Sequence, residues 1–370
     1  MERRIILRNG DTLVCSEKSA VIRFAAPRNV LATSANGGGL RRDLTAVFNY
    51  SDCGRAGVCQ PMEGHDLREH QVAVAKRLGL DPCHTAGLDT AANLDNLAVV
   101  TREWEELWVT AIVSGGADVN ALCAGDPAHL TERLGEPCLV PAGTINILLV
   151  IGARLSPGAL TEALLTATEA KTALLRDLMQ GSSVSAELAT GTGTDGAILI
   201  CDGSDGECLY NAGKHFKLGE LIASAVKAAA AEALFRQTGL CPQGQHRTLR
   251  RLKRFGITER SLLEQCLSEF PNGESAIRRA IEHIDQDGFL VSAAALYVHL
   301  LDQERSGMLT RGETGDWYAR LLTLAAEHYQ YPIGAAQMDD PVEALETFLA
   351  EVLKGHLREQ RRLYPTEEPL

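Results

Sequence analysis

The stretch TINILLVIGARLSPGALTEALLTATEAKTALLRDL, residues 144–178, decides the fold class. Its first nine residues are rich in Ile, Leu and Val and are closed by Gly152, which is typical of a buried strand. Ser156 then precedes Pro157, so a favoured N-cap is followed by a favoured first helical residue, and apolar residues recur at helical spacing. The stretch therefore predicts a strand followed by a long helix, as in an α/β domain.

The same mixture of strand-like and helix-like patterns extends over about the first 240 residues. Short β-type runs come first: RIIL, TLVCS, AVIRFA and NVLATSA. LREHQVAVAKRLGL reads as a helix that Gly79 ends, and an Ala-rich helix, LGELIASAVKAAAAEALFRQTG, ends at Gly239. With LWVTAIVSGG and GAILICD as further strands, we expect residues 1–240 to form an α/β domain in which helices pack on a mixed sheet.

The character of the chain changes after CPQGQ, residues 241–245. From there on only helical periodicity and charged surfaces are evident, so residues 246–370 are predicted to form a smaller all-α region. Packing against the first domain, oligomerisation or a partner contact are its expected roles. An exposed apolar face on VEALETFLAEVL would favour a homo-oligomer.

Composition excludes several classes of protein. The formal net charge of −12 argues against a nucleic-acid binder, and the basic strip QHRTLRRLKRFG is interpreted as a linker or helix surface. No apolar run approaches the roughly 18 residues of a membrane span, and the N-terminus lacks a signal-peptide core. The ten cysteines are scattered without a disulfide framework, so we expect reduced thiols in a cytoplasmic protein.

One stretch, CGRAGVCQPMEGHDLREH, carries potential metal ligands in Cys53, Cys59, His65 and His70. Its C-x5-C spacing is not that of a zinc knuckle. We therefore expect no metal and an ordinary loop.

Six polar clusters interrupt the apolar framework, most of them at predicted strand ends, where α/β domains bind ligands. Their repeated Gly with Thr, Asn or Asp suits an amide-decorated ligand. They are SANGGGL (34–40), TAGLDTAANLDN (85–96), SGGADVNA (114–121), PAGTIN (141–146), TATEAKT (166–172), and ATGTGTD (189–195) with GKH (213–215).

The Gly- and Thr-rich loop LATGTGTDGAILI is not a phosphate loop, because it lacks the GxxxxGK[ST] spacing and precedes a strand rather than a helix. An internal Thr needs a base partner to act as a nucleophile, and His215 is the nearest candidate in sequence. Glu169 either faces solvent or points into the cleft as a general base.

Five motifs together resemble the adenosylcobinamide amidohydrolase (CbiZ) family of corrinoid salvage. They are NGG (36–38), GTINILLV (143–150), ALTEALLTATEAKTALL (159–175), ATGTGTD (189–195) and GKHFKLGELI (213–222), in consistent order over roughly residues 29–234. One departure is VSGGADVNA, where a Thr-Ala-Gly type sequence would be more typical at Ser114–Gly116. The Ser in place of Thr keeps the hydroxyl.

The resemblance implies hydrolysis of the amide between the aminopropanol arm and the corrin ring of adenosylcobinamide, giving adenosylcobyric acid. The corrinoid is then the substrate, and no cofactor is required. We expect water-mediated hydrolysis, with His215 or Glu169 as base. We prefer this mechanism to one with a covalent Thr intermediate. The expected catalytic residues are His215, Glu169, Asp195, Thr192 and Thr194.

Expected substrate-binding residues are those whose amides, hydroxyls, amines or backbone N–H groups suit the corrin amides and the developing oxyanion. They are Asn36, Gly37, Gly38, Asn120, Thr144, Asn146, Lys171, Thr190, Gly191, Gly193 and Lys214, together with Asn93. Two alternatives stay open: a non-catalytic corrinoid-binding module linked to uptake, and an α/β enzyme acting on another amide or a nucleotide.

Overall fold

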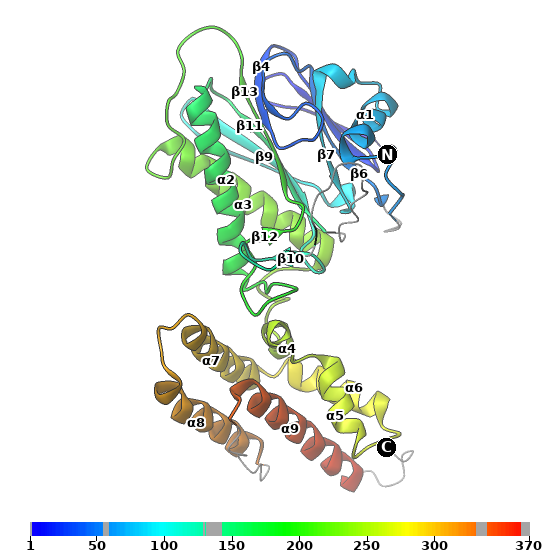
Figure 1. Cartoon of the computed structure of the whole chain (residues 1–370), viewed down its shortest axis with the longest axis vertical. Helices are drawn as coiled ribbons and strands as arrows, with labels where there is room; N and C mark the ends of the chain where they lie inside the picture. The colour runs from blue at the N-terminus through cyan, green and yellow to red at the C-terminus, as the bar shows by residue number, and fades with distance from the viewer. Residues whose placement is uncertain (1, 55–58, 129, 131–142, 331–338, 364–370) are drawn as a thin grey trace. The chain divides into compact units, whose positions relative to one another are not determined.

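The computed structural model describes residues 2–54, 59–128, 130, 143–330 and 339–363 (Figure 1). The chain forms two compact units, Met1–Cys241 and Pro242–Leu370. Each unit has its own hydrophobic core.

A six-stranded mixed sheet forms the centre of the first unit. β11 (Ile145–Ile151) and β13 (Gly196–Asp202) are parallel neighbours because α2 (Pro157–Asp177) connects them, and the other pairs are antiparallel. The strand order is β5 (Gly39–Arg41), β4 (Arg28–Ala32), β13 (Gly196–Asp202), β11 (Ile145–Ile151), β9 (Leu107–Gly115) and β8 (Ala98–Trp104).

The run INILLVI is apolar throughout because β11 is covered on both faces. Ile147 and Leu149 pack under the two long helices, whereas Leu148 and Val150 face the opposite way into a second core. Its alternate residues therefore belong to two different cores.

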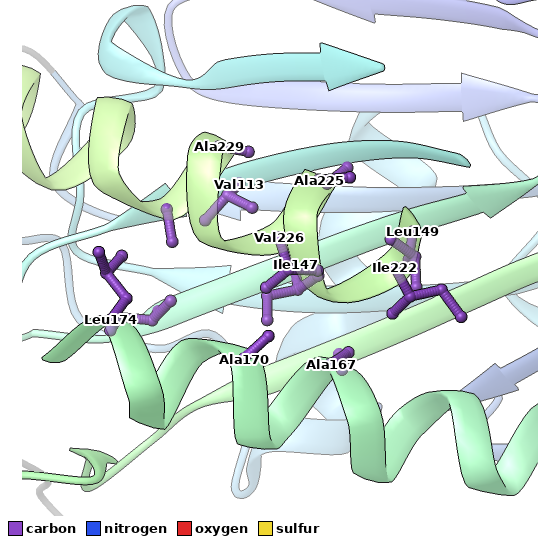
Figure 2. Close-up of a cluster of buried hydrophobic side chains, with 14 of the residues drawn as sticks. Val113, Ile147, Leu149, Ala167, Ala170, Leu174, Ile222, Ala225, Val226 and Ala229 are labelled. Atoms are coloured by element: carbon purple, nitrogen blue, oxygen red, sulfur yellow. The ribbon is translucent and has the colours of Figure 1, made fainter. Parts of the chain in front are cut away.

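The two long helices, α2 and α3 (Lys217–Thr238), cover one face of this sheet (Figure 1). Ala167 and Ala170 of α2 and Ala225 and Ala229 of α3 pack in this core, around β-strand residues such as Ile147 (Figure 2). Small side chains allow such close packing, which explains the Ala-rich sequences of both helices. The predicted start of α2, with its Ser156 cap, and the predicted Gly end of α3 are confirmed.

A second, five-stranded sheet covers the other face of the first. Leu13 and Ile22 of this sheet share a core with Val150 and Ile200 of the six-stranded sheet. α1 (Leu67–Arg77) packs on its outer face against Phe48. Its strand order is β1 (Arg3–Ile6), β2 (Thr12–Cys15), β3 (Ser19–Arg23), β6 (Ala46–Ser51) and β7 (Thr85–Thr90).

The first unit is thus layered as helices, sheet, sheet and helix. The predicted α/β class with a mixed sheet and packed helices is confirmed. The sequence patterns did not indicate that the strands divide between two stacked sheets. A short pair, β10 (Ala121–Leu122) with β12 (Gly191–Thr192), and the 3-10 turns η2 (Pro82–His84) and η3 (Leu94–Asn96) complete the unit.

The second unit is all-α in its described residues, around a core that includes Tyr297, Phe348 and Leu353. Most apolar side chains of VEALETFLAEVL lie in this core, so this stretch does not present the exposed apolar face that would favour a homo-oligomer. The unit comprises α4 (Thr248–Leu252), η4 (Lys253–Phe255), α5 (Glu259–Leu267), α6 (Glu274–Asp285), α7 (Gly288–Arg305), α8 (Arg311–Tyr329) and α9 (Pro341–Leu363).

The basic strip of the sequence lies at the start of this unit and forms α4 and η4. Arg254 pairs with Asp302 at 2.6 Å and Arg247 pairs with Asp285 at 3.3 Å, so part of its charge is used inside the unit. Within the described residues, no helix has the length and apolar character needed to cross a membrane.

Candidate active site

A cavity of about 480 Å³ lies where strand ends from both sheets meet. This volume falls within the roughly 300–1,000 Å³ typical of small-molecule sites. One wall comes from the starts of β11 and β13, and the facing wall from the end of β7 and the segment after β6. The polar lining residues are Thr33, Ser34, Asp52, Gln60, Gln71, Asp89, Thr90, Thr144, Asn146, Thr194 and Asp195.

The first wall is built around the Asp195 carboxylate. Its oxygens accept hydrogen bonds from the Ile145 N–H at 3.0 Å, the Thr192 N–H at 3.0 Å and the Thr192 hydroxyl at 2.5 Å. The Lys171 ammonium of α2 forms an ion pair with the same carboxylate. A Cβ at Gly191 would collide with Asp195 Oδ2. These contacts fix the loop before β13 and leave Asp195 fully partnered.

Thr194 and Gly143 join the two loops that precede β11 and β13. The Thr194 hydroxyl donates to the Gly143 carbonyl at 2.9 Å, and the Thr144 hydroxyl donates to the Thr194 carbonyl at 2.7 Å. Asn120 also donates to the Gly143 carbonyl, at 2.9 Å. The Gly193 N–H, expected to face an oxyanion, donates instead to the Asn120 carbonyl at 3.2 Å.

Asn146 connects the two sheets at the floor of the cavity. Its side-chain amide donates to Asn49 Oδ1 at 2.8 Å and to the Asp89 carbonyl at 2.9 Å. Asn49 in turn donates to the Ser114 hydroxyl at 2.7 Å. The Ser at position 114, where the motif favours Thr, thus uses its hydroxyl inside this buried network.

The facing wall carries a cluster of two carboxylates and an imidazole. His70 Nε2 of α1 lies 3.0 Å from Asp52 Oδ1 and 3.6 Å from Asp89 Oδ1. The Glu63 N–H donates to His70 Nδ1 at 2.9 Å. Gln71 Nε2 donates to Asp89 Oδ2 at 2.6 Å. We call Asp52, His70 and Asp89 the Asp–His–Asp cluster.

Burial and neighbouring charge change the protonation of this cluster. Burial is the largest cause that raises the pKa of Asp89, to about 6; the Asp52 charge also raises it, and the Gln71 hydrogen bond opposes the change. The hydrogen bond with Asp52 raises the pKa of His70, against an opposing effect of burial. The carboxyl group of Asp89 therefore binds and releases its proton at a higher pH than an ordinary aspartate, near pH 6.

The ligand atoms of the cluster all lie within 4.8 Å of one another, as metal ligands would. The Glu63 N–H, however, occupies the lone pair of His70 Nδ1, so the proton of a neutral ring resides on Nε2. A protonated Nε2 has no lone pair for a cation. In this arrangement the cluster is suited to holding a proton, and the sequence-based expectation of no metal stays a prediction.

Three of the five expected catalytic residues, Glu169, His215 and Thr192, lie outside the cavity lining. Glu169 and Lys214 form an ion pair with their side chains 57% and 67% exposed. His215 precedes α3 and is also exposed. Thr194 and Asp195 do line the cavity, and Thr192 holds Asp195 from behind.

The expected substrate-binding residues are similarly divided. Thr144 and Asn146 line the cavity, whereas Lys171, Thr190, Gly191, Gly193 and Asn120 support its wall from behind. Asn93 caps η3 through its side chain.

The NGG motif packs against η2 and β7. Asn36 donates from its side chain to the Pro82 and Thr85 carbonyls and from its backbone to Gln71 Oε1. Gly37 and Gly38 have no room for a Cβ, because it would meet the Thr85 and Ser34 carbonyls respectively. The motif therefore positions Gln71 and β7.

Cys53 and Cys59 form a disulfide, so the expectation of reduced thiols was wrong for this pair. Cys59 lines the cavity. The other described cysteines form no disulfide. His65 is exposed, whereas His70 is buried in the Asp–His–Asp cluster.

Sequence reasoning missed Asp52, Gln71 and Asp89 as site residues. Asp89 lies in the polar cluster TAGLDTAANLDN, and His70 lies in the stretch considered for metal binding, so both signals were present. The sequence did not predict the parallel pairing of β6 with β7. This pairing places Asp52 and Asp89 at the same end of the two strands.

Comparisons with known proteins agree with the motif resemblance. Residues 6–242 match the family model described as adenosylcobinamide amidohydrolase, CbiZ. An uncharacterized protein of Methanocaldococcus jannaschii is 34% identical over 240 residues, which cover 61% of this chain and 89% of that protein. The adenosylcobinamide amidohydrolase of Methanosarcina mazei is 32% identical over 160 residues, which cover 41% of this chain and 66% of that protein.

Among solved structures, a β-aminopeptidase of a Burkholderia species aligns with a TM-score of 0.31 and 16% identity, covering 68% of this chain and 87% of that one; this likeness is too weak to carry an argument. The family model, by contrast, spans more than half of the chain and includes every residue of both cavity walls. The chain belongs to the adenosylcobinamide amidohydrolase family, which supports a hydrolase of corrinoid salvage.

Proposed function

We propose that this protein hydrolyses the amide between the aminopropanol arm and the corrin ring of adenosylcobinamide, giving adenosylcobyric acid. The observation that carries the proposal is the cavity itself. Its first wall consists of the family motifs at residues 143–150 and 189–195, and its facing wall holds titratable groups. A hydrolase needs a positioned amide and a nearby group that transfers protons.

The size of the cavity supports a specific mode of binding. A corrin ring with its adenosyl ligand is much larger than a cavity of about 480 Å³, whereas a single amide arm fits. The arm would therefore enter the cavity while the macrocycle rests at its mouth. In this mode the corrinoid is the substrate, and no resident cofactor takes part.

Water is the proposed nucleophile, and Thr194 is the hydroxyl placed to orient it, since this side chain lines the cavity. His215 or Glu169 as the base remains the sequence-based assignment. Because both are exposed and absent from the lining, a conformational change or a bound macrocycle would have to bring them to the amide. The carboxyl groups that already line the cavity, those of Asp52, Asp89 and Asp195, need no such step.

The test is incubation of the purified chain with adenosylcobinamide, followed by mass spectrometry of the corrinoid and of released aminopropanol. The expected result is stoichiometric adenosylcobyric acid and aminopropanol. Tight retention of intact adenosylcobinamide would instead identify the non-catalytic binding module. If neither binding nor turnover of adenosylcobinamide is detected, the result would favour an enzyme that acts on another amide or on a nucleotide.

A further inference from the structure

The carboxyl groups that line the cavity differ in how they are hydrogen-bonded. Asp195 accepts from four donors, so it has no oxygen available for a proton. Asp89 accepts at Oδ2 from Gln71, and its buried Oδ1 has no hydrogen-bond partner. A buried carboxylate oxygen without a donor is unfavourable, and protonation relieves it. Asp89 therefore differs from Asp195 in being ready to accept a proton.

The orientation of the Asp89 carboxyl group is fixed by a defined chain of contacts. Gln71 Oε1 accepts from the Asn36 N–H at 2.8 Å and from the Ser34 hydroxyl at 3.1 Å. This fixes which end of the Gln71 amide is the donor, and that donor reaches Asp89 at 2.6 Å. The NGG motif thus orients a carboxyl group of the cavity wall.

A single imidazole N–H stands between two carboxylates in the cluster. His70 Nε2 lies 3.0 Å from Asp52 Oδ1 and 3.6 Å from Asp89 Oδ1, and the side chains of Asp52 and Asp89 are 20% and 11% exposed. Because His70 and Asp89 lie this close, the protonation of one affects the protonation of the other. Both carboxylates line the cavity, while His70 lies behind them.

We infer that the Asp–His–Asp cluster is the proton-transfer centre of the cavity, with Asp52 and Asp89 as the acid–base groups and His70 and Gln71 as positioning residues. The inference rests on the proposed function. It assigns proton transfer to residues that lie outside the five motifs of the family resemblance. Of these motifs, only NGG contributes to this wall, through its contact with Gln71.

The reaction then proceeds with its atoms balanced. A carboxylate of the cluster takes one proton from a water molecule as the water oxygen bonds to the amide carbon. The tetrahedral adduct loses its C–N bond, and the proton held by the cluster passes to the departing nitrogen. Aminopropanol leaves as the amine, and the second water proton leaves with the new carboxyl group.

The test compares Asp89→Asn and Asp52→Asn with Asp43→Asn, an exposed residue that pairs with Arg41 and is not part of the cavity lining. We expect kcat on adenosylcobinamide to fall about 10²- to 10⁴-fold in the two cluster variants, as for loss of a general acid or base. The dissociation constant for adenosylcobinamide should change only a few-fold, and Asp43→Asn should match the wild type.

The pH profile of the wild type supplies a readout that needs no variant. The groups facing Asp89 are His70 of α1 and Asp52 after β6, with Asp195 on the other wall, where Lys171 pairs with it from behind. We expect kcat/KM to rise with ionisation of Asp89 near pH 6, and this limb of the profile to be lost in Asp89→Asn.

The inference would be overturned if Asp89→Asn and Asp52→Asn each kept near wild-type turnover, or if the wild-type pH profile lacked the limb near pH 6. Either result would leave the proposed function unaffected. Absence of wild-type turnover would overturn the proposed function and this inference with it. If a cluster variant does not fold, the pH profile of kcat/KM for the wild type tests the inference by itself.

Discussion

The ammonium of Lys171 and the carboxylate of Asp195 form an ion pair that joins the inner face of α2 to the loop before β13. Their side chains are 9% and 17% exposed. The helix that covers the six-stranded sheet therefore also fixes the position of one wall of the cavity. Lys171 supports this wall from behind and does not line the cavity.

Replacing Lys171 with Met should destabilise the protein by about 3 kcal/mol, because removal of one partner leaves a largely buried charge uncompensated. Denaturant unfolding measures the effect. Lys214→Met is the matched control, since its ion pair with Glu169 is exposed and worth about 0–1 kcal/mol. Equal losses in the two variants would contradict a structural role for the Lys171–Asp195 pair.

Asp89→Asn should stabilise the protein at alkaline pH even though it removes activity. Folding raises the pKa of Asp89 from 3.8 to about 6, so its favourable contribution is complete below pH 3.8 and is lost as the pH rises through 6. At pH 8 the ionised carboxylate opposes folding by about 3 kcal/mol, the equivalent of this change in pKa. The variant should therefore melt at a higher temperature than the wild type at pH 8.

The same pair of proteins, compared by thermal unfolding at about pH 4, gives the control, because Asp89 is then protonated in the folded state. The advantage of Asn should disappear there. A variant that melts below the wild type at both pH values would show that Asp89 has a structural role instead.

Gly191→Ala should destabilise the first unit by about 1–3 kcal/mol, because the new methyl group overlaps the Asp195 carboxylate and the Lys171 amine. Gly315→Ala provides the opposite control: Gly315 lies inside α8 with nothing within 4 Å of a Cβ, so the change should stabilise by up to about 1 kcal/mol. Urea midpoints of the two variants should move in opposite directions.

Glu169→Gln and His215→Ala should retain turnover within a few-fold of the wild type if the Asp–His–Asp cluster transfers the proton. Both residues are exposed and absent from the cavity lining. Steady-state assays with adenosylcobinamide measure this. A loss of 100-fold or more in either variant would favour the sequence-based assignment of the base.

A chain ending at Cys241 should fold by itself and retain the cavity. The family model matches residues 6–242, which is almost the whole of the first unit. A cooperative melting transition and unchanged adenosylcobinamide turnover are the expected measurements. A truncated chain that aggregates or melts without cooperativity would instead show that the helical unit stabilises the first one.

The sequence by itself determined the local elements and the family. Alternating or continuous apolar runs identify β9, β11 and β13, and Ser156, Pro157 and Gly239 mark helix ends, because capping and periodicity depend on neighbouring residues. The motifs also identified one wall of the cavity, with Thr144, Asn146, Thr194 and Asp195 among the expected site residues.

Only the tertiary structure decided which polar residues meet. Asp52, His70 and Asp89 come from three separate segments of the chain. The parallel pairing of β6 with β7 together with the packing of α1 brings their polar atoms within 4.8 Å of one another. Glu169 and Lys171 show the same limit on a single helix: two residues apart on α2, one is exposed and the other is buried against Asp195. Local patterns cannot specify such contacts, because they depend on how separate apolar faces pack.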